Sequence, residues 1–172
     1  MTAGRGILRA AAVFLALAAL WGCGYRFSGG GDDIPAGIVR VYVEPPRNQT
    51  GEAGLENTFR AAFTDWFIKG GRFKVTSSPE EADAVWRGTI KSLVSSHLSF
   101  RQANVAQEER LTVTIEVTFR DRSTGRVLWE DKNFTGSQDY NLSGGEAAKK
   151  EALSTLAADT AERAYRMMMS GF

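Results

Sequence analysis

The sequence predicts an α/β protein, a two-layer sandwich in which a mixed sheet of about four strands carries two helices packed on one face. Residues 86–94 and 111–120 alternate between apolar and polar side chains, as strands with one covered face do. Residues 55–67 and 152–168 repeat their apolar side chains at helical spacing. A strand, a helix and another strand near the start of this region predict parallel pairing through a right-handed crossover.

Composition and charge exclude several classes of protein. The chain has 172 residues, a formal net charge of +1, one cysteine and one histidine. A single cysteine excludes an intramolecular disulfide framework and a multi-thiolate metal site, and a single histidine excludes a His-rich metal site. The near-zero net charge argues against a nucleic-acid partner. We expect no metal and no cofactor.

Residues 1–22 are predicted to be a lipoprotein signal peptide. Arg5 and Arg9 precede the apolar run Ala10–Leu20, which is shorter than the roughly 20 residues that span a bilayer but fits a signal-peptide core. The run leads into Leu20-Trp21-Gly22-Cys23, which resembles a bacterial lipobox. The resemblance implies that Cys23 is acylated and becomes the mature N-terminus. The alternative is that Cys23 is an ordinary buried thiol.

The predicted cleavage changes the charge balance. It would remove Arg5 and Arg9, so that 19 basic side chains remain against 20 acidic ones. An anionic ligand would then be recognised by a local patch rather than by the charge of the whole protein. Residues 23–37 include three consecutive glycines and are predicted to be the lipidated N-terminus and a flexible tether. Residues 38–172 are predicted to form one domain, lipid-anchored at the cell outer membrane.

The first elements of this domain are short. Ile38–Val43 is rich in β-branched residues and predicts a strand, which the following prolines end. Residues 55–69 predict a helix with an aromatic stripe, ended by Gly70-Gly71. Phe73–Thr76 predicts the strand that completes the crossover.

Longer elements follow. Ser95–Glu109 lies between the two alternating strands and is predicted to be the projecting end of their hairpin. Asp121–Gly125 has turn-forming residues and predicts a second hairpin, whose returning strand runs to Phe134 or Tyr140. Ser143–Glu146 has the pattern of a capping box and predicts the start of the last helix.

No residue pattern points to catalysis. His97 lacks a matching nucleophile pattern and is predicted to lie in a loop or at a strand end. The acidic pair Glu108-Glu109 is predicted to be solvated, whereas catalytic carboxylates need burial or a partner. We therefore expect no enzymatic activity. Phe100 beside Arg101 combines an apolar surface with a forked cation, which suits an amphiphile with phosphate groups. The alternative is an exposed hairpin whose arginine has no such role.

Several short motifs recur in a fixed order along the mature chain. They are Cys23–Phe27, Ile38–Thr50, Gly54–Glu56, Gly71–Val75, Ala82–Ala84, Gly88–Ile90, Arg110–Val113 and Asp121–Trp129. Each motif is weak alone, but their order and spacing resemble the LptE family of lipopolysaccharide-assembly lipoproteins.

The resemblance implies a fold of two helices on a four-stranded sheet. It also implies a role as a plug inside the LptD-like outer-membrane barrel, which the protein helps to assemble and through which it helps deliver lipopolysaccharide to the outer leaflet. The expected partners are therefore that barrel, lipopolysaccharide and the outer-membrane lipid reached through Cys23. Lipopolysaccharide contact is implied at Phe100 and Arg101, with Lys149 and Lys150 as further candidates. The alternatives are an accessory lipoprotein of another envelope or secretion system, and an enzyme facing the periplasm.

Overall fold

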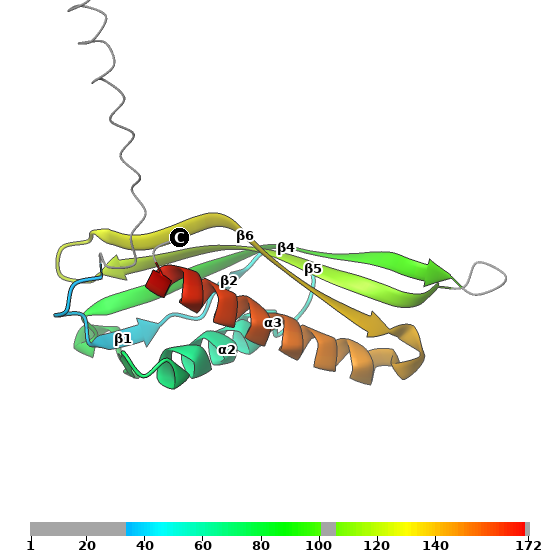
Figure 1. Cartoon of the computed structure of the whole chain (residues 1–172), viewed down its shortest axis with the longest axis horizontal. Coiled ribbons are helices and arrows are strands. Elements are labelled where there is room, and N and C mark those ends of the chain that lie inside the picture. Colours follow the sequence, from blue (N-terminus) through cyan, green and yellow to red (C-terminus); the bar gives the residue numbers. More distant parts are fainter. Residues whose placement is uncertain (1–33, 101–105, 171–172) are drawn as a thin grey trace, which may run out of the picture.

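A single mixed sheet runs the length of the molecule in the order β3-β1-β4-β5-β6, with β2 also paired to β4. The structure is a computed structural model that describes residues 34–100 and 106–170. The strands are β1 (Arg40–Val43), β2 (Arg47–Asn48), β3 (Lys74–Val75), β4 (Ala84–Phe100), β5 (Ala106–Asp121) and β6 (Val127–Asn141). Helices α2 (Leu55–Lys69) and α3 (Gly145–Ser170) lie on the same face of this sheet (Figure 1).

The predicted two-layer α/β fold is confirmed. The sheet has six strands rather than about four, and two of them, β2 and the predicted β3, have only two residues each. The sequence does not predict β2, which follows two prolines and pairs in parallel with Thr89 and Ile90 of β4. The predicted crossover is present, since β1 pairs in parallel with β3 on one side and with β4 on the other. Strands β4, β5 and β6 pair antiparallel.

The inner face of β5 is the floor of the hydrophobic core. From position 111 to 119 every second side chain of this strand is between 0 and 1% exposed, namely Leu111, Val113, Ile115, Val117 and Phe119. The same alternation puts polar residues on the opposite face, as the sequence predicts. Burying an aliphatic or aromatic side chain of this size stabilises the fold by about 1.5–3 kcal/mol, so this row drives the helices onto the sheet.

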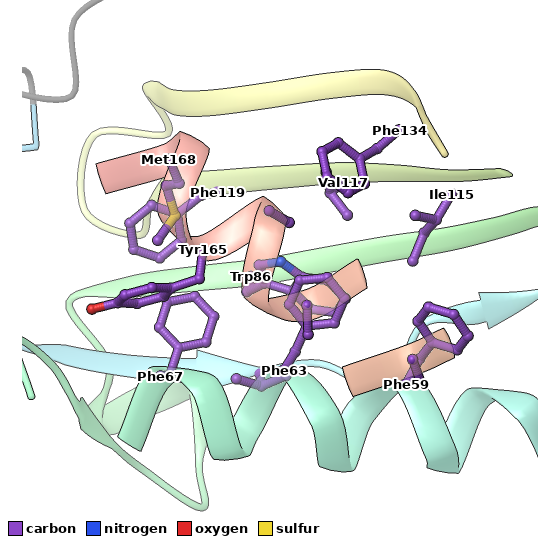
Figure 2. Close-up of a cluster of buried hydrophobic side chains, with 14 of the residues drawn as sticks. Phe59, Phe63, Phe67, Trp86, Ile115, Val117, Phe119, Phe134, Tyr165 and Met168 are labelled. Carbon is purple, nitrogen blue, oxygen red and sulfur yellow. The ribbon is translucent and has the colours of Figure 1, made fainter. Parts of the chain in front are cut away.

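Helix α2 covers the core with an aromatic stripe. Phe59, Phe63 and Phe67 lie one turn apart and point into the sheet (Figure 2). The ring of Phe63 lies 4.0 Å from that of Trp86 on β4. Tyr165 of α3 meets Phe67 edge-on, with 5.7 Å between ring centroids. The two helices therefore share one aromatic cluster, as the helical periodicity predicts.

Helix α3 approaches β6 closely because both elements carry small residues there. A Cβ atom added to Gly136 would lie 2.1 Å from Oγ1 of Thr160. Thr160 is fully buried, and its Oγ1 has no hydrogen-bond partner among the described residues. The backbone of β6 at Gly136 lies directly against α3, and this leaves no room for a methyl group. Glycine is therefore required at position 136.

The start of α3 differs from the predicted capping box. A short 3₁₀ turn, η4 (Leu142–Gly144), precedes the helix. Its cap is the side chain of Asn141, whose Oδ1 accepts a hydrogen bond from the amide of Ser143 at 2.8 Å. Asn141 ends β6 in the extended conformation that an N-cap needs and caps this 3₁₀ turn, whereas Ser143 lies inside the turn and α3 begins at Gly145.

Asp83 ties the first strand to the start of β4. Its carboxylate accepts hydrogen bonds from the amides of Val39 and Arg40, at 3.2 and 2.8 Å. The guanidinium of Arg40 adds a 2.8 Å ion pair. The Arg40 hydrogen bonds hold the pKa of Asp83 well below its usual range.

We predict that Gly136→Ala destabilises the protein. The added methyl group would collide with Thr160 and push α3 away from β6, and overpacking of this kind typically costs about 1–3 kcal/mol. Chemical unfolding would measure the change. The matched control is Gly51→Ala, since a Cβ atom at Gly51 meets nothing within 4 Å. Equal stability of the two variants would contradict the close-packing explanation.

We predict that Asp83→Asn lowers stability at neutral pH and flattens its acid dependence. A depressed folded-state pKa means that the stabilisation is complete above the ordinary value of 3.8 and is lost as pH falls from there toward the folded value. The free energy of unfolding, measured from neutral pH into this acidic range, tests this. Asp159→Asn, at an exposed position of α3, is the control. A wild-type acid profile in the Asp83 variant would refute the assignment.

Candidate functional site

Strands β4 and β5 form a long hairpin that leads away from the core. They remain paired out to Phe100 and Ala106. Figure 1 places this end of the hairpin at the same end of the molecule as the start of α3. The predicted hairpin over Ser95–Glu109 is therefore confirmed up to the last described residues on each side.

A carboxylate sits at the centre of the inner face of this hairpin. Glu109 accepts hydrogen bonds from Oγ of Ser95 on β4, at 2.5 Å, and from the hydroxyl of Tyr140 on β6, at 2.8 Å. Nδ1 of His97 lies 3.1 Å from its other oxygen. Only 15% of the Glu109 side chain is exposed. One acidic group thus connects all three long strands.

The ionisation of the cluster follows from these contacts. The hydrogen bonds from Ser95 and Tyr140 lower the pKa of Glu109. Burial, followed by the hydrogen bond to Glu109, raises the pKa of Tyr140 to about 12. Glu109 is therefore a carboxylate and Tyr140 a neutral donor across the physiological range, which is the pairing that a charge-assisted hydrogen bond requires.

A pocket of about 480 Å³ lies nearby, between the starts of the two helices. Lys149 and Lys150 of α3 line it together with Glu146 and with Glu52, just before α2. Nζ of Lys149 lies 2.7 Å from Oε2 of Glu52, and this hydrogen bond raises the pKa of Lys149. Two acidic and two basic side chains line the pocket, so a phosphate would have to compete with Glu52 for Lys149.

Helix α2 also begins at this pocket. Gly54 precedes it with a φ of 81°, and no side chain caps the helix. A positive φ is unstrained only for glycine, which explains the residue type. The first amides of α2 are accordingly not occupied by a capping side chain, and their dipoles favour negative charge at the pocket.

The structure brings together only some of the predicted contact residues. Phe100 is the last residue of β4, and Lys149 and Lys150 lie in the first turns of α3 at the same end of the molecule. Lys149 is ion-paired, whereas Lys150 is exposed. Cys23 and Arg101 lie outside the described residues.

The outer face of the sheet is a second notable surface. Its charged side chains pair across neighbouring strands, Lys91 with Glu116 at 3.0 Å and Arg110 with Asp139 at 2.6 Å. Threonines at alternate positions of β5 fill the space between them. The face is therefore largely polar, although Val94 is exposed on it, and no described helix covers it.

One sequence-based expectation is wrong. Glu109 was expected to be a solvated strand-end carboxylate, but it is largely buried and hydrogen-bonded. The missed signal is its position: Glu109 lies two residues before Leu111 and so falls on the inner face of β5. Tyr140 has the same parity as Phe134 and Gly136 on β6. If the alternation of inward and outward side chains is continued beyond the apolar residues of β5 and β6, Glu109 and Tyr140 both fall on the inner face of the sheet.

In the described part of the chain, no helix combines the length and the apolar character needed to cross a bilayer. Within residues 34–100 and 106–170, no group of His, Cys, Asp and Glu side chains is arranged to hold a metal ion.

The fold and the site define a small two-layer α/β domain with a polar hairpin extending from one end. Residues 38–168 match the LptE family, described as lipopolysaccharide-assembly. This match covers most of the chain, which therefore belongs to the LptE family. No curated protein sequence matches the chain.

Solved structures with the same fold are distant in sequence. A protein from Xanthomonas campestris has a TM-score of 0.53 at 12% identity, covering 77% of this chain and 87% of its own. A hypothetical protein from Chlamydia trachomatis has a TM-score of 0.51 at 11% identity, covering 76% and 98%. A candidate lipoprotein from Caulobacter crescentus has a TM-score of 0.50 at 16% identity, covering 73% and 88%. At these identities the similarity establishes the fold alone.

We predict that Glu109→Gln loosens the hairpin. A neutral amide is a weaker acceptor for Ser95 and Tyr140 than a carboxylate, so the free energy of unfolding should fall by about 1 kcal/mol. Amide exchange in residues 95–98 should become faster. The matched control is Glu130→Gln, at an exposed position of β6. If both variants keep wild-type exchange in this segment, Glu109 does not hold the three strands together.

Proposed function

We propose that this protein is an outer-membrane lipoprotein that plugs the LptD-like lipopolysaccharide translocon and assists its assembly. In this role it helps deliver lipopolysaccharide to the outer leaflet, and it acts by binding rather than by catalysis. The match of residues 38–168 to the LptE family is the observation that carries the proposal. The geometry of the outer sheet face and of the hairpin end supports it.

The outer sheet face suits a barrel lumen. The inside of a large outer-membrane barrel is polar, so a plug has to present a polar surface to it. Lys91 and Arg110 are already paired with Glu116 and Asp139 on this face. A face with its charges paired in this way can be enclosed at a smaller desolvation cost than one with isolated charges.

The hairpin end suits lipopolysaccharide, which carries acyl chains and phosphate groups. We place Phe100, Arg101 and Lys150 in this contact, because β4 ends at Phe100 and Lys150 is exposed at the same end of the molecule. Lys149 would take part only by exchanging its partner Glu52 for a phosphate. The N-terminal anchor in this proposal is acylated Cys23, which raises the effective concentration of the domain beside a membrane-embedded partner.

Purification of the tagged protein at native expression level, after detergent extraction, tests the partner. We predict that a barrel protein of much larger mass co-purifies with it, identified by mass spectrometry as LptD-like. A matched strain expressing an untagged copy controls for nonspecific recovery. Recovery of the lipoprotein alone would refute the stable plug, and recovery with components of another envelope machine would favour the accessory role in that system.

A charge-reversal pair tests the lipopolysaccharide contact. We predict that Arg101→Glu with Lys150→Glu weakens binding of purified lipopolysaccharide about tenfold, because two cations that face phosphates become repulsive. The control is Lys74→Glu. Lys74 is an exposed residue of the edge strand β3, away from the end of the β4–β5 hairpin. Thermal unfolding of all variants should be alike. Equal binding by both variants would remove these residues from the contact.

A further inference from the structure

Strand β4 has an open edge beyond Ile90. Up to that residue its side opposite β5 is occupied by β1 and β2, and the amide of Gln49 donates to the carbonyl of Ile90 at 2.9 Å. From Lys91 to Phe100, its only strand partner among the described residues is β5. The outer half of β4 is therefore an edge of the sheet (Figure 1).

The main chain along this edge is directed outward. The carbonyl of Ile90 points away from β5, because it accepts from Gln49. The β5 partner of Ile90 is Ile115. Main-chain directions alternate along an antiparallel pair, so the β5 residues two and four positions before Ile115 also point away from β4. Their β4 partners, Leu93 and Ser95, consequently turn their N–H and C=O groups toward the open side.

The side chains of this edge do not protect it from pairing. Strand edges are usually blocked by charged residues, by prolines or by bulges. Ser92–Phe100 contains no Lys, Arg, Asp, Glu, Gly or Pro. Its pairing with β5 is regular over Ser92–His97, with bulges only before and after this stretch. Val94 and Leu98 are 56% and 41% exposed, so the edge is also partly apolar.

The other two edges of the sheet are short or blocked. Strand β3 has only two residues. Strand β6 is long, but Arg163 of α3 donates to the carbonyl of Thr135. Oδ1 of Asp131 accepts from the amide of Asn133 at 2.8 Å. Side chains thus occupy main-chain groups of β6 that an added strand would need, which leaves the β4 edge as the long open one in the described part of the sheet.

A second copy of the same strand fits this edge. An antiparallel arrangement with its two-fold axis at Ser95 places Ser95 opposite Ser95, and Leu93 opposite His97 of the other copy. The outward main-chain groups of the two strands then face one another and can exchange hydrogen bonds. The two Val94 side chains become diagonal neighbours, about 7–8 Å apart, on the outer face. No like charges meet, because Ser92–His97 contains no Lys, Arg, Asp or Glu.

We propose that two copies of this chain pair antiparallel along Ser92–His97, so that their sheets join into one. The same surface is used on both copies, which gives a closed two-fold dimer. One pair of short strand segments is a small interface, so the association is weak and increases with concentration. The proposal does not depend on the function proposed above, since it uses only groups of this chain and its copy.

Cysteine cross-linking in the full-length, detergent-extracted lipoprotein tests the register. We predict that Val94→Cys forms a cross-link between two copies with a short bismaleimide. A mixture of ¹⁵N-labelled and unlabelled protein would give joined peptides of mixed label in mass spectrometry. The matched control is Ser137→Cys, at an exposed position of β6 on the other side of Thr112, which pairs with both residues. Equal cross-linking of both variants, or of neither, would overturn the proposal.

Sedimentation equilibrium in a density-matched detergent tests the association itself. We predict that the mass of the wild-type protein rises toward that of two copies with increasing concentration. Val94→Lys should weaken this association about tenfold, because it places two ammonium groups beside each other across the two-fold axis. Ser137→Lys adds the same charge away from the edge and should leave the association unchanged. Thermal unfolding of both variants should match the wild type.

Two results of these measurements would contradict the dimer. One is a wild-type protein that stays monomeric at all concentrations, and the other is equal association of the two lysine variants. Amide exchange at Leu93 and Ser95 adds a further check, since the dimer predicts slower exchange at higher concentration. Protection of these amides that arises only when the barrel protein is added would overturn self-pairing and assign the edge to a strand of that partner. Failure of the dimer leaves the barrel co-purification experiment unaffected.

Discussion

The need to cover the inner face of β5 determines how this molecule is built. Five consecutive inward side chains of that strand are shielded from water, and two helices supply the cover. Helix α2 covers it with large rings, whereas α3 combines larger side chains such as Leu156 and Tyr165 with alanines and Thr160, which allow a close approach to β6. The contact of Phe63 with Trp86 is an example of the first kind of packing, and the close approach of Thr160 to Gly136 is an example of the second. Both helices lie on this one face, and the alternate side chains on the opposite face are polar.

Strands β4 and β5 extend further than the two helices that cover the sheet (Figure 1). The proposed binding end is this extension. Beyond Leu111 the inner face of β5 changes from apolar to charged at Glu109, which binds side chains of both neighbouring strands. Beside the start of α3, this hydrogen-bonded carboxylate replaces apolar packing in holding the three strands together. The hairpin can therefore project without a hydrophobic underside. Lys150 and the end of β4 consequently lie at one end of the molecule, where an amphiphilic ligand could meet both.

The sequence predicts the long strands and the helices well, because their apolar side chains recur at regular spacing along the chain. The alternation of β5 and the aromatic stripe of α2 place the strand, the helix and the buried face of each, because burial imposes these patterns directly. Strand β2 could not be predicted, since two residues carry no period and depend on pairing with β4. The Glu109 cluster depends on partners from β4 and β6 that are distant in sequence, although the parity of Glu109 marks its face. The 3₁₀ turn capped by Asn141 was not predicted, because Ser143 and Glu146 match the capping-box pattern and so suggested that the helix begins directly after Ser143.

We propose that this LptE-family protein serves the delivery of lipopolysaccharide to the cell surface. Its most direct test is controlled depletion of the protein, followed by labelling of lipopolysaccharide accessible from outside the cell. Surface lipopolysaccharide should fall while newly made lipopolysaccharide accumulates inside the envelope, and the wild-type chain should restore delivery. Unchanged surface lipopolysaccharide in fully depleted cells would contradict the claim.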